Sequence, residues 1–271
     1  MKIFFNLFSL ALITLLLSTS CTKDKAEIKT FDPKDLIKSQ ISNDHIIARY
    51  RYSSKGKIEE VESRYYYKKY MYDDEDKLVK EENSMNLDVL SSSTSSPTDN
   101  GLVTAENCIL TNYRIFVYDG VDSLKEIEYF HKEDEHFTYK SKRSLIYNDG
   151  HIIRVNLHDK TGEIKQFFTY TYDDNGNVIS EKYYTENIEP ELISEITYSY
   201  DDKKNPFIIF NQLGVPGIYT NSNNIIEENF TLYVAVPGAD STTFKRNTYE
   251  YNLQGNPIKL MTEYDEFIYT Y

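Results

Sequence analysis

The chain has 271 residues, a formal net charge of −13 and 40% hydrophobic residues, which is enough for one large folded domain. Its acidic balance excludes nucleic acid as an expected partner, because the phosphate backbone attracts basic surfaces. Cys21 and Cys108 are the only two cysteines, so no disulfide framework is expected. The sequence also has no phosphate loop, nucleophile elbow or zinc-protease helix, and it predicts no cofactor.

The first residues have the pattern of a cleaved export signal. Lys2 precedes the apolar run "IFFNLFSLALITLLL" and the segment "LSTSC"; the run is shorter than the ~20 residues of a comfortable membrane span. Small residues that lead into a cysteine resemble a bacterial lipoprotein signal, in which cleavage before the cysteine leaves it lipidated. We therefore expect a signal peptide over 1–20, lipidation of Cys21 and a tether over 21–31. The alternative is a secretory signal with Cys21 kept for a disulfide.

Cleavage would remove Lys2 and leave 29 basic and 43 acidic residues, a net charge of −14. Acyl chains on Cys21 would make the membrane a partner of the protein. The segment "TKDKAE" after Cys21 has no Asp at its second position, which argues against inner-membrane retention by the usual enterobacterial rule. We expect a lipid anchor in the outer membrane, on the periplasmic or the cell-surface leaflet.

The mature chain is predicted to form one domain over 32–271, and it starts with a helical pattern. In "DPKDLIKSQIS" (32–42), Asp32 suits the N-cap and Pro33 the first helical position. Three apolar residues then fall on one face: Leu36, Ile37 and Ile41. A helix is therefore expected before the first strands.

From residue 50 onwards a hairpin pattern repeats, and its fullest copy is "YTYDDNGNVISEKYY" (170–184). Asp173 can accept hydrogen bonds from the backbone amides of the turn, and Gly176 supplies the left-handed residue of a three-residue loop with a bulge. Asn177 completes the motif. This register sets Tyr172 opposite Val178.

Further copies of the hairpin begin near residues 50, 70, 116, 158, 198 and 249. The position that requires positive φ is occupied by Gly56, Asp76, Asp122, Gly162, Lys204 and Gly255. Lys is poorly suited to that conformation, so Lys204 marks the copy with the least certain register. "YNDGHI" (147–152) predicts a two-residue variant of the same turn.

The turns are separated by strands of seven to ten residues, so that successive turns lie at opposite ends of the strands. The sequence therefore predicts an all-β fold, a large curved up-and-down antiparallel meander with one or two short helices. Residues 83–107 are rich in Ser and Thr and predict a flexible insertion rather than a domain boundary. Cys108 follows this insertion and is expected to be a small buried hydrophobic residue.

Two short segments invite functional interpretations. In "FHKEDEHF" (130–137), a four-residue turn would set His131 opposite His136, an incomplete zinc site for which a solvated hairpin tip is the simpler explanation. "DSL" and "DST" resemble an acceptor sequence for O-glycosylation in Bacteroidetes and make Ser123 and Ser241 candidates. Both serines are otherwise ordinary turn residues.

Residues 205–214, "NPFIIFNQLG", predict a second short helix that ends at Gly214, with a strand as the alternative because Ile208 and Ile209 are β-branched.

The motif Y-x-Y-D-x-x-G-N, complete at 170–178, resembles the tyrosine-aspartate (YD) repeats of the RHS family. Together with the N-terminal signal it resembles YD-rich lipoproteins of Bacteroidetes. In long RHS proteins such repeats build a shell around a toxin; this chain is too short for such a shell and ends at "FIYTY". The resemblance therefore implies strands and turns more than a function.

Three classes of function follow. The first is a non-enzymatic envelope protein whose broad sheet face binds a glycan, a peptide or a protein. The second is a carrier that shelters an acyl chain or a lipoprotein in a curved sheet. The third is an enzyme such as a glycosidase, for which no spacing of carboxylates singles out an acid and base pair. A polar, Tyr-lined face would favour the first class and an apolar concave face the second.

Overall fold

The computed structural model describes residues 33–86, 101–120, 123–233 and 240–271. They belong to one compact unit, Asp32–Tyr271. The predicted signal peptide, Cys21 and the tether lie outside the described residues, as does Asp122.

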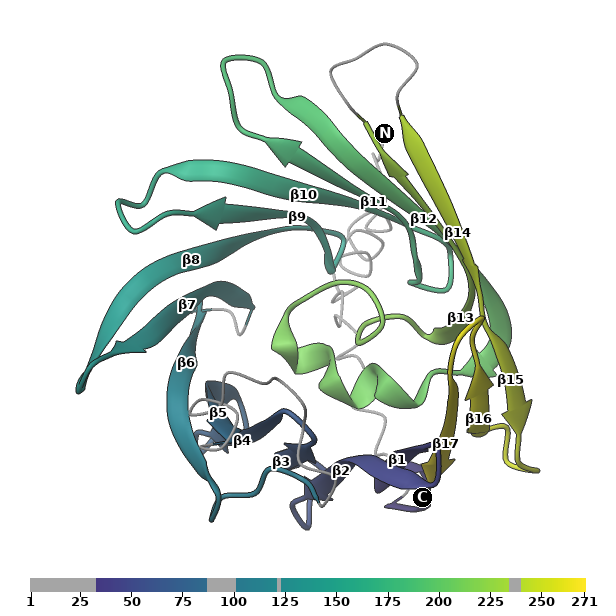
Figure 1. The fold of residues 1–271 in the computed structure, drawn as a ribbon. Helices are drawn as coiled ribbons and strands as arrows, with labels where there is room; N and C mark the ends of the chain where they lie inside the picture. Colours follow the sequence, from purple (N-terminus) through teal and green to yellow (C-terminus); the bar gives the residue numbers. More distant parts are fainter. Residues whose placement is uncertain (1–32, 87–100, 121–122, 234–239) are drawn as a thin grey trace, which may run out of the picture. The chain divides into compact units, whose positions relative to one another are not determined.

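The described residues form strands and two short 3-10 helices (Figure 1). The helices are η1 (Pro33–Asp35) and η2 (Pro206–Leu213). The strands are β1 (Ser39–Ser42), β2 (His45–Tyr52), β3 (Ile58–Ser63), β4 (Tyr66–Tyr72), β5 (Leu78–Asn86), β6 (Cys108–Tyr118), β7 (Leu124–Glu133), β8 (His136–Asn148), β9 (His151–His158), β10 (Ile164–Tyr172), β11 (Val178–Thr185), β12 (Glu191–Lys204), β13 (Asn223–Leu232), β14 (Ser241–Arg246), β15 (Thr248–Tyr251), β16 (Pro257–Met261) and β17 (Glu266–Thr270).

The strands form one antiparallel sheet in which neighbours in sequence are neighbours in space. Each strand from β1 to β13 pairs with the next, and β15, β16 and β17 form the final meander. Pairing of β1 with β17 then joins the two ends of the sheet into a nearly closed ring. Only Asn247 separates β14 from β15, and there the chain changes partner from β13 to β16. The predicted fold class is confirmed.

The repeated turns share one hydrogen-bonding pattern. In the fullest copy, the Asp173 carboxylate accepts hydrogen bonds from the backbone amides of Asn175 and Asn177, at 2.9 and 2.8 Å. Gly176 has φ 80°, and Tyr172 lies opposite Val178 across a bulge, as the sequence predicts. The same acceptor pattern occurs at Ser53, Asp73, Asp159 and Asn252. The corresponding positive-φ residues are Gly56, Asp76, Gly162 and Gly255.

Tyrosine hydroxyls join each repeat to the one before it. Tyr172 donates a hydrogen bond to the carbonyl of Ile152, and Tyr200 donates one to the carbonyl of Val178. The other described pairs of this kind are Tyr52–Ile37, Tyr72–Ile58, Tyr118–Leu78, Tyr147–Leu124 and Tyr271–Pro257. We call this series the tyrosine ladder. Most of the acceptors are apolar residues just after a hairpin turn, whereas Ile37 follows η1. Several of these residues are fully buried, so the apolar core lies at the end of the ring that holds these turns.

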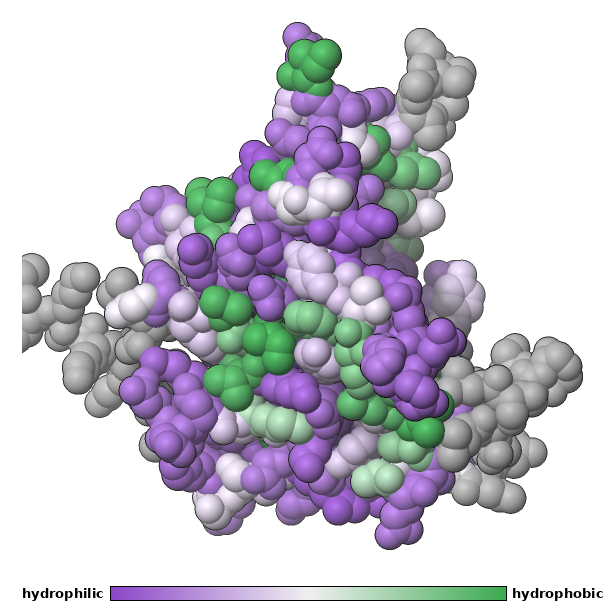
Figure 2. All heavy atoms as spheres, turned by 90° about the vertical axis from the view of Figure 1, so that its left-hand side faces the viewer, coloured by the Kyte–Doolittle hydropathy of each residue, from purple (hydrophilic) through white to green (hydrophobic). Residues whose placement is uncertain are grey.

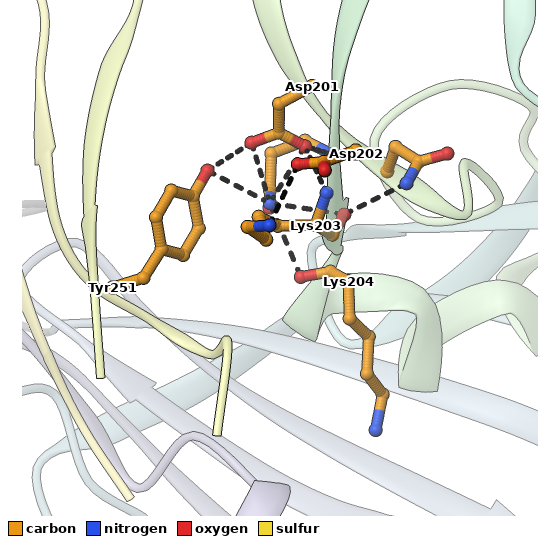
Figure 3. Close-up of polar contacts among 7 residues, drawn as sticks. Asp201, Asp202, Lys203, Lys204 and Tyr251 are labelled. Carbon is orange, nitrogen blue, oxygen red and sulfur yellow. Dashed lines mark hydrogen bonds and ion pairs between the residues drawn. The ribbon is translucent and has the colours of Figure 1, made fainter. Parts of the chain in front are cut away.

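The turn predicted for the hairpin copy that begins near residue 198 is wrong, because the chain inserts a long segment there. The Asp201 carboxylate accepts from the amide of Lys203 at 3.0 Å (Figure 3). Its second backbone donor is the amide of Asn224 at 3.1 Å. Tyr200 lies opposite Ile225, as Tyr172 lies opposite Val178. Residues 204–223 therefore interrupt an otherwise regular YD turn. Lys204 is the last residue of β12 and does not occupy the positive-φ position.

The inserted segment (204–223), which we call the plug, carries η2. The Asn205 side chain caps η2 by accepting from the amide of Phe207, and Gly214 ends it with φ 63°, which confirms the predicted helix. Ile209, Phe210 and Leu213 are buried. In Figure 1, η2 lies across the space that the sheet surrounds.

Aromatic side chains hold the plug against several strands. The Phe210 ring packs against Tyr50 of β2 with 5.8 Å between centroids, and the Phe207 ring against Tyr269 of β17 at 5.8 Å. Gln212 donates to the hydroxyl of Tyr72. The plug therefore touches strands from both ends of the chain and helps to hold the ring together.

The helix predicted over 32–42 is wrong beyond its first turn. Only η1 forms, and β1 follows because its backbone pairs with both β2 and β17. Leu36 and Ile37 are nonetheless buried. Ring closure thus overrides the local helical pattern.

The Ser-rich insertion is shorter than predicted. Strand β5 continues to Asn86, and Val103 is 1% exposed and pairs with Ser63. Residues 87–100 of the predicted insertion lie outside the described residues.

The outward face carries many ion pairs between neighbouring strands. Figure 2 shows one side of the molecule as mostly hydrophilic with smaller groups of apolar residues. Typical pairs are Lys142–Glu126 at 3.0 Å and Lys182–Glu195 at 3.7 Å. No helix among the described residues is long and apolar enough to cross a membrane.

Candidate functional site

The interior of the ring contains a group of cationic side chains. Strand alternation puts Lys68 of β4, Arg114 of β6 and Arg143 of β8 on the inward face, and we call these three residues the basic cluster. Glu81 of β5 lies opposite Arg114 in the sheet and is 1% exposed. Its carboxylate lies 3.4 Å from the Lys68 ammonium and 3.8 Å from the Arg114 guanidinium. One carboxylate thus faces two of the three cations.

Arg143 has no such partner. Among the described residues no hydrogen bond or ion pair reaches its guanidinium. Burial lowers the pKa of Arg143, and the positive charge of Arg114 lowers it further. An arginine remains charged under these conditions, so the interior holds a cation whose charge is only partly compensated.

Two cavities meet at the basic cluster, and both are lined by Arg114 and Arg143. One has a volume of about 250 Å³ and reaches the plug at Phe210 and Leu213. The other has a volume of about 390 Å³ and is also lined by Asn83, whose side-chain oxygen is buried without a hydrogen-bond partner. The two guanidinium groups therefore border open space on both sides.

Tyrosine hydroxyls surround the first of these cavities. Tyr66 and Tyr70 of β4 line it together with Tyr50 and Tyr219. Burial raises the pKa of Tyr66, Tyr70 and Tyr219 above the usual 10.0. Each hydroxyl therefore keeps its proton at neutral pH and can donate a hydrogen bond.

Another part of the interior is acidic. Glu181 of β11 and Glu228 of β13 line a cavity of about 350 Å³, together with Tyr198 of β12. Burial raises the pKa of Glu181. Tyr170 of β10 interacts electrostatically with both Glu181 and Arg143. The interior therefore offers cationic, anionic and hydroxyl groups beside apolar side chains such as Phe207 and Phe210.

Comparison with known proteins leaves the function open. No family model and no curated protein matches the chain in sequence. A porin-like protein from Bacteroides vulgatus is 9% identical, with 87% of this chain and 98% of that chain covered and a TM-score of 0.41. One from Bacteroides uniformis is 10% identical over 86% and 96% of the chains, with a TM-score of 0.39. The Photorhabdus luminescens Tc holotoxin pore is 14% identical over 80% of this chain and 12% of that chain, with a TM-score of 0.27. The functional inferences below therefore rest on the sequence and on the site.

The predicted pairing of His131 with His136 is wrong. Strands β7 and β8 meet at a shorter turn, in which Glu133 lies opposite His136 and His131 lies opposite Thr138. Asp134 adopts φ 54° in this turn. No group of three or more His, Cys, Asp or Glu side chains in the described part of the chain is arranged to hold a metal ion.

The two candidate glycosylation sites lie in different surroundings. Ser123 is exposed in a turn, where its amide donates to the Asp119 carboxylate. Ser241 is also exposed, but it begins β14 and pairs with Leu232, so its predicted turn position is wrong. Cys108 begins β6 as a half-buried free thiol.

The basic cluster was not identified from the sequence, although the sequence contains a signal for it. In "YRIFVYD" (113–119), alternation puts Arg114 on the same face as Phe116 and Tyr118. An arginine on the apolar face of a strand is unusual and indicates a buried polar environment. The spatial meeting of Arg114 with Arg143 depends on the register of three strands, which no local pattern specifies.

Proposed function

We propose that the chain is an exported, lipid-anchored cell-envelope protein that binds a polar ligand inside the ring of strands and catalyses no reaction. Export and the anchor are supported by the segment that ends in "LSTSC" at Cys21. The outer membrane is the proposed location.

The polar interior is the observation that carries this proposal. A carrier of an acyl chain needs an apolar concave surface, because burial of hydrocarbon away from water drives binding. Here the inward face presents Arg114, Arg143, Glu181 and several tyrosines to the cavities. Such groups recognise hydroxyl, amide or charged groups by hydrogen bonds, so a glycan or a peptide suits the interior better than a lipid.

Two measurements test the proposal. Labelling with a fatty-acid analogue is expected to mark the wild type and not the Cys21→Ser variant. Equal labelling of both would show that Cys21 does not carry the lipid. Apart from the acyl chains on Cys21, mass spectrometry of the protein from its host is expected to find no fatty acid held non-covalently inside the ring. A stoichiometric acyl chain that survives delipidation of Cys21 would instead favour the carrier.

A hydrolase is the second candidate, because Ser144 and His158 form a hydrogen-bonded pair. The Ser144 hydroxyl lies 2.8 Å from Nε2 of His158, and Nδ1 of His158 lies 2.9 Å from the carbonyl oxygen of Gly162. A proton on Nδ1 would leave Nε2 free to accept the serine proton, as a general base does. However, Ser144 also accepts a hydrogen bond from Asn156, and its strand position is outward.

Reaction with a fluorophosphonate distinguishes the two candidates. The binding proposal predicts no labelling of Ser144. Stoichiometric labelling that is lost in Ser144→Ala and His158→Ala would establish the hydrolase in its place.

A further inference from the structure

The charges of the interior are unequal on its two sides. Glu81 compensates for Lys68 and Arg114 only in part, since its two contacts are 3.4 and 3.8 Å long. Arg143 adds a third positive charge with no ion-pair partner in the described part of the chain. On the outward face the neighbouring residue, Lys142, has Glu126 at 3.0 Å. The uncompensated positive charge is therefore a property of the interior and not of the strand.

A buried cation whose charge is only partly compensated is unfavourable for folding unless something else is gained. The chain as a whole has a formal net charge of −13, so general attraction of anions to its surface does not explain the arrangement. Arginine is suited to bind an oxyanion because its planar guanidinium can donate two parallel hydrogen bonds. Two guanidinium groups that line the same two cavities form a site for such a group.

The surroundings also specify what accompanies the oxyanion. The Asn83 side-chain oxygen and Oε2 of Glu81 are buried without hydrogen-bond partners. Both are acceptors, so a ligand that satisfies them must donate hydrogen bonds, as sugar hydroxyls do. Tyr66, Tyr70 and Tyr219 supply aromatic faces and hydroxyl donors on the other side of the cluster.

We propose that the basic cluster binds an acidic sugar, with its carboxylate or phosphate between Arg114 and Arg143 and its hydroxyls toward Asn83 and Glu81. This inference rests on the proposed binding inside the ring and names the chemical class of the ligand. The carboxylate of a uronic acid and the phosphate of a sugar phosphate share the oxyanion chemistry.

Calorimetric titration of the full mature protein with glucuronate, glucose 6-phosphate and glucose tests the inference. At least one acidic sugar is expected to bind, and neutral glucose at least about tenfold more weakly, which corresponds to one charge-assisted hydrogen-bonded contact. The stronger of the two acidic sugars identifies the oxyanion. The inference would be overturned if neither acidic sugar bound, or if glucose bound as tightly as the acidic sugars.

Arg143→Met and Lys182→Met form the pair of variants, because Arg143 lines both cavities whereas Lys182 pairs with Glu195 on the outward face. Arg143→Met is expected to weaken binding of the acidic sugar by about tenfold or more, whereas Lys182→Met leaves it unchanged. Arg143→Met is also expected to melt at the same or a higher temperature than the wild type, since it removes an uncompensated charge. A lower melting temperature with unchanged affinity would assign Arg143 a purely structural role.

Different results would contradict the proposal that a ligand binds inside the ring. If acidic sugars do not bind, but a neutral oligosaccharide or a peptide does and is lost in the interior variant Glu181→Gln, only the acidic-sugar inference is wrong. If no interior substitution changes the binding of any of these probes, binding inside the ring is wrong as well.

Discussion

At the scale of single residues, the turns depend on backbone conformation more than on side-chain contacts. Gly176 has φ 80°, and a Cβ atom at this position would lie 3.3 Å from Cε1 of His151. A β-branched residue is strained at positive φ whatever the space around it. Because both effects act together here, Gly176 is a more demanding position than the exposed Asn175 beside it.

Gly176→Val is expected to lower the melting temperature by several degrees, and Asn175→Ala by much less. Thermal unfolding followed by circular dichroism checks both variants. If the two melt alike, the positive-φ residue does not limit the stability of the turn.

The tyrosine ladder predicts a small, specific effect of single hydroxyls. Tyr172→Phe removes the hydrogen bond to the Ile152 carbonyl and leaves the ring in place, so a loss of about 1 kcal/mol in unfolding free energy is expected. Tyr65 is 56% exposed and lies outside the ladder, so Tyr65→Phe serves as the control. Denaturant unfolding measures both, and equal values would mean that the ladder adds no stability.

At the scale of elements, the plug is an insertion into one repeat. Replacement of residues 204–223 by a single glycine would give "YSYDDKGNII", which has the same motif as "YTYDDNGNVI" at 170–179. The Asp201 and Asn224 side chains already make the contacts of a regular turn. Excision is therefore expected to preserve the strand content and to lower the melting temperature, because the buried face of η2 is lost.

Far-ultraviolet circular dichroism and thermal unfolding test the excision. A variant that loses its strand signal would show that the sheet forms only around the plug. Lys204 does not occupy the positive-φ position and forms an ion pair with Asp35 at 2.9 Å, so Lys204→Gly is expected to destabilise the fold.

Asp35 connects η1 to distant parts of the ring and gives stability a pH dependence. Its carboxylate accepts from Asn256 and pairs with Lys204, and these contacts hold its pKa below the usual 3.8. A carboxylate with a lowered folded-state pKa stabilises the protein above its unfolded pKa of about 3.9 and loses this effect as the pH falls through the folded value.

Asp35→Asn is therefore expected to melt below the wild type at pH 7, with a difference that shrinks as the pH falls below about 3.9. The control is Asp202→Asn, which removes a fully exposed carboxylate and is expected to change little. Melting temperatures measured across this pH range decide the matter, and a pH-independent difference would contradict the assigned role of Asp35.

At the scale of the whole molecule, local patterns predicted the meander but not its closure. The turn at Asp173 and Gly176 is encoded within five residues, so its geometry and register follow from the sequence. The contacts of Asp201 with Asn224 span the plug, and the helix expected at 32–42 became a strand because β17 pairs with it from the far end of the chain. Such contacts depend on the assembled ring.

The candidate site was less predictable for the same reason. Arg114 and Arg143 are each visible as arginines on inward strand positions, but the sequence does not show that they line one cavity. Their neighbours Glu81 and Asn83 come from a third strand, β5, which precedes residues 87–100 in the sequence, whereas Arg114 and Arg143 follow them. Cavities formed by several strands become visible only when the register of every strand is known.

The central claim is that a ligand binds inside the ring, and binding to a glycan and peptide array tests it most directly. The double variant Arg143→Met, Glu181→Gln changes two inward residues, and Lys182→Met changes the outward neighbour of Glu181 on the same strand. The account predicts that array ligands of the wild type are lost in the inward variant and kept in the outward one. Ligands kept by the inward variant and lost by the outward one would contradict it.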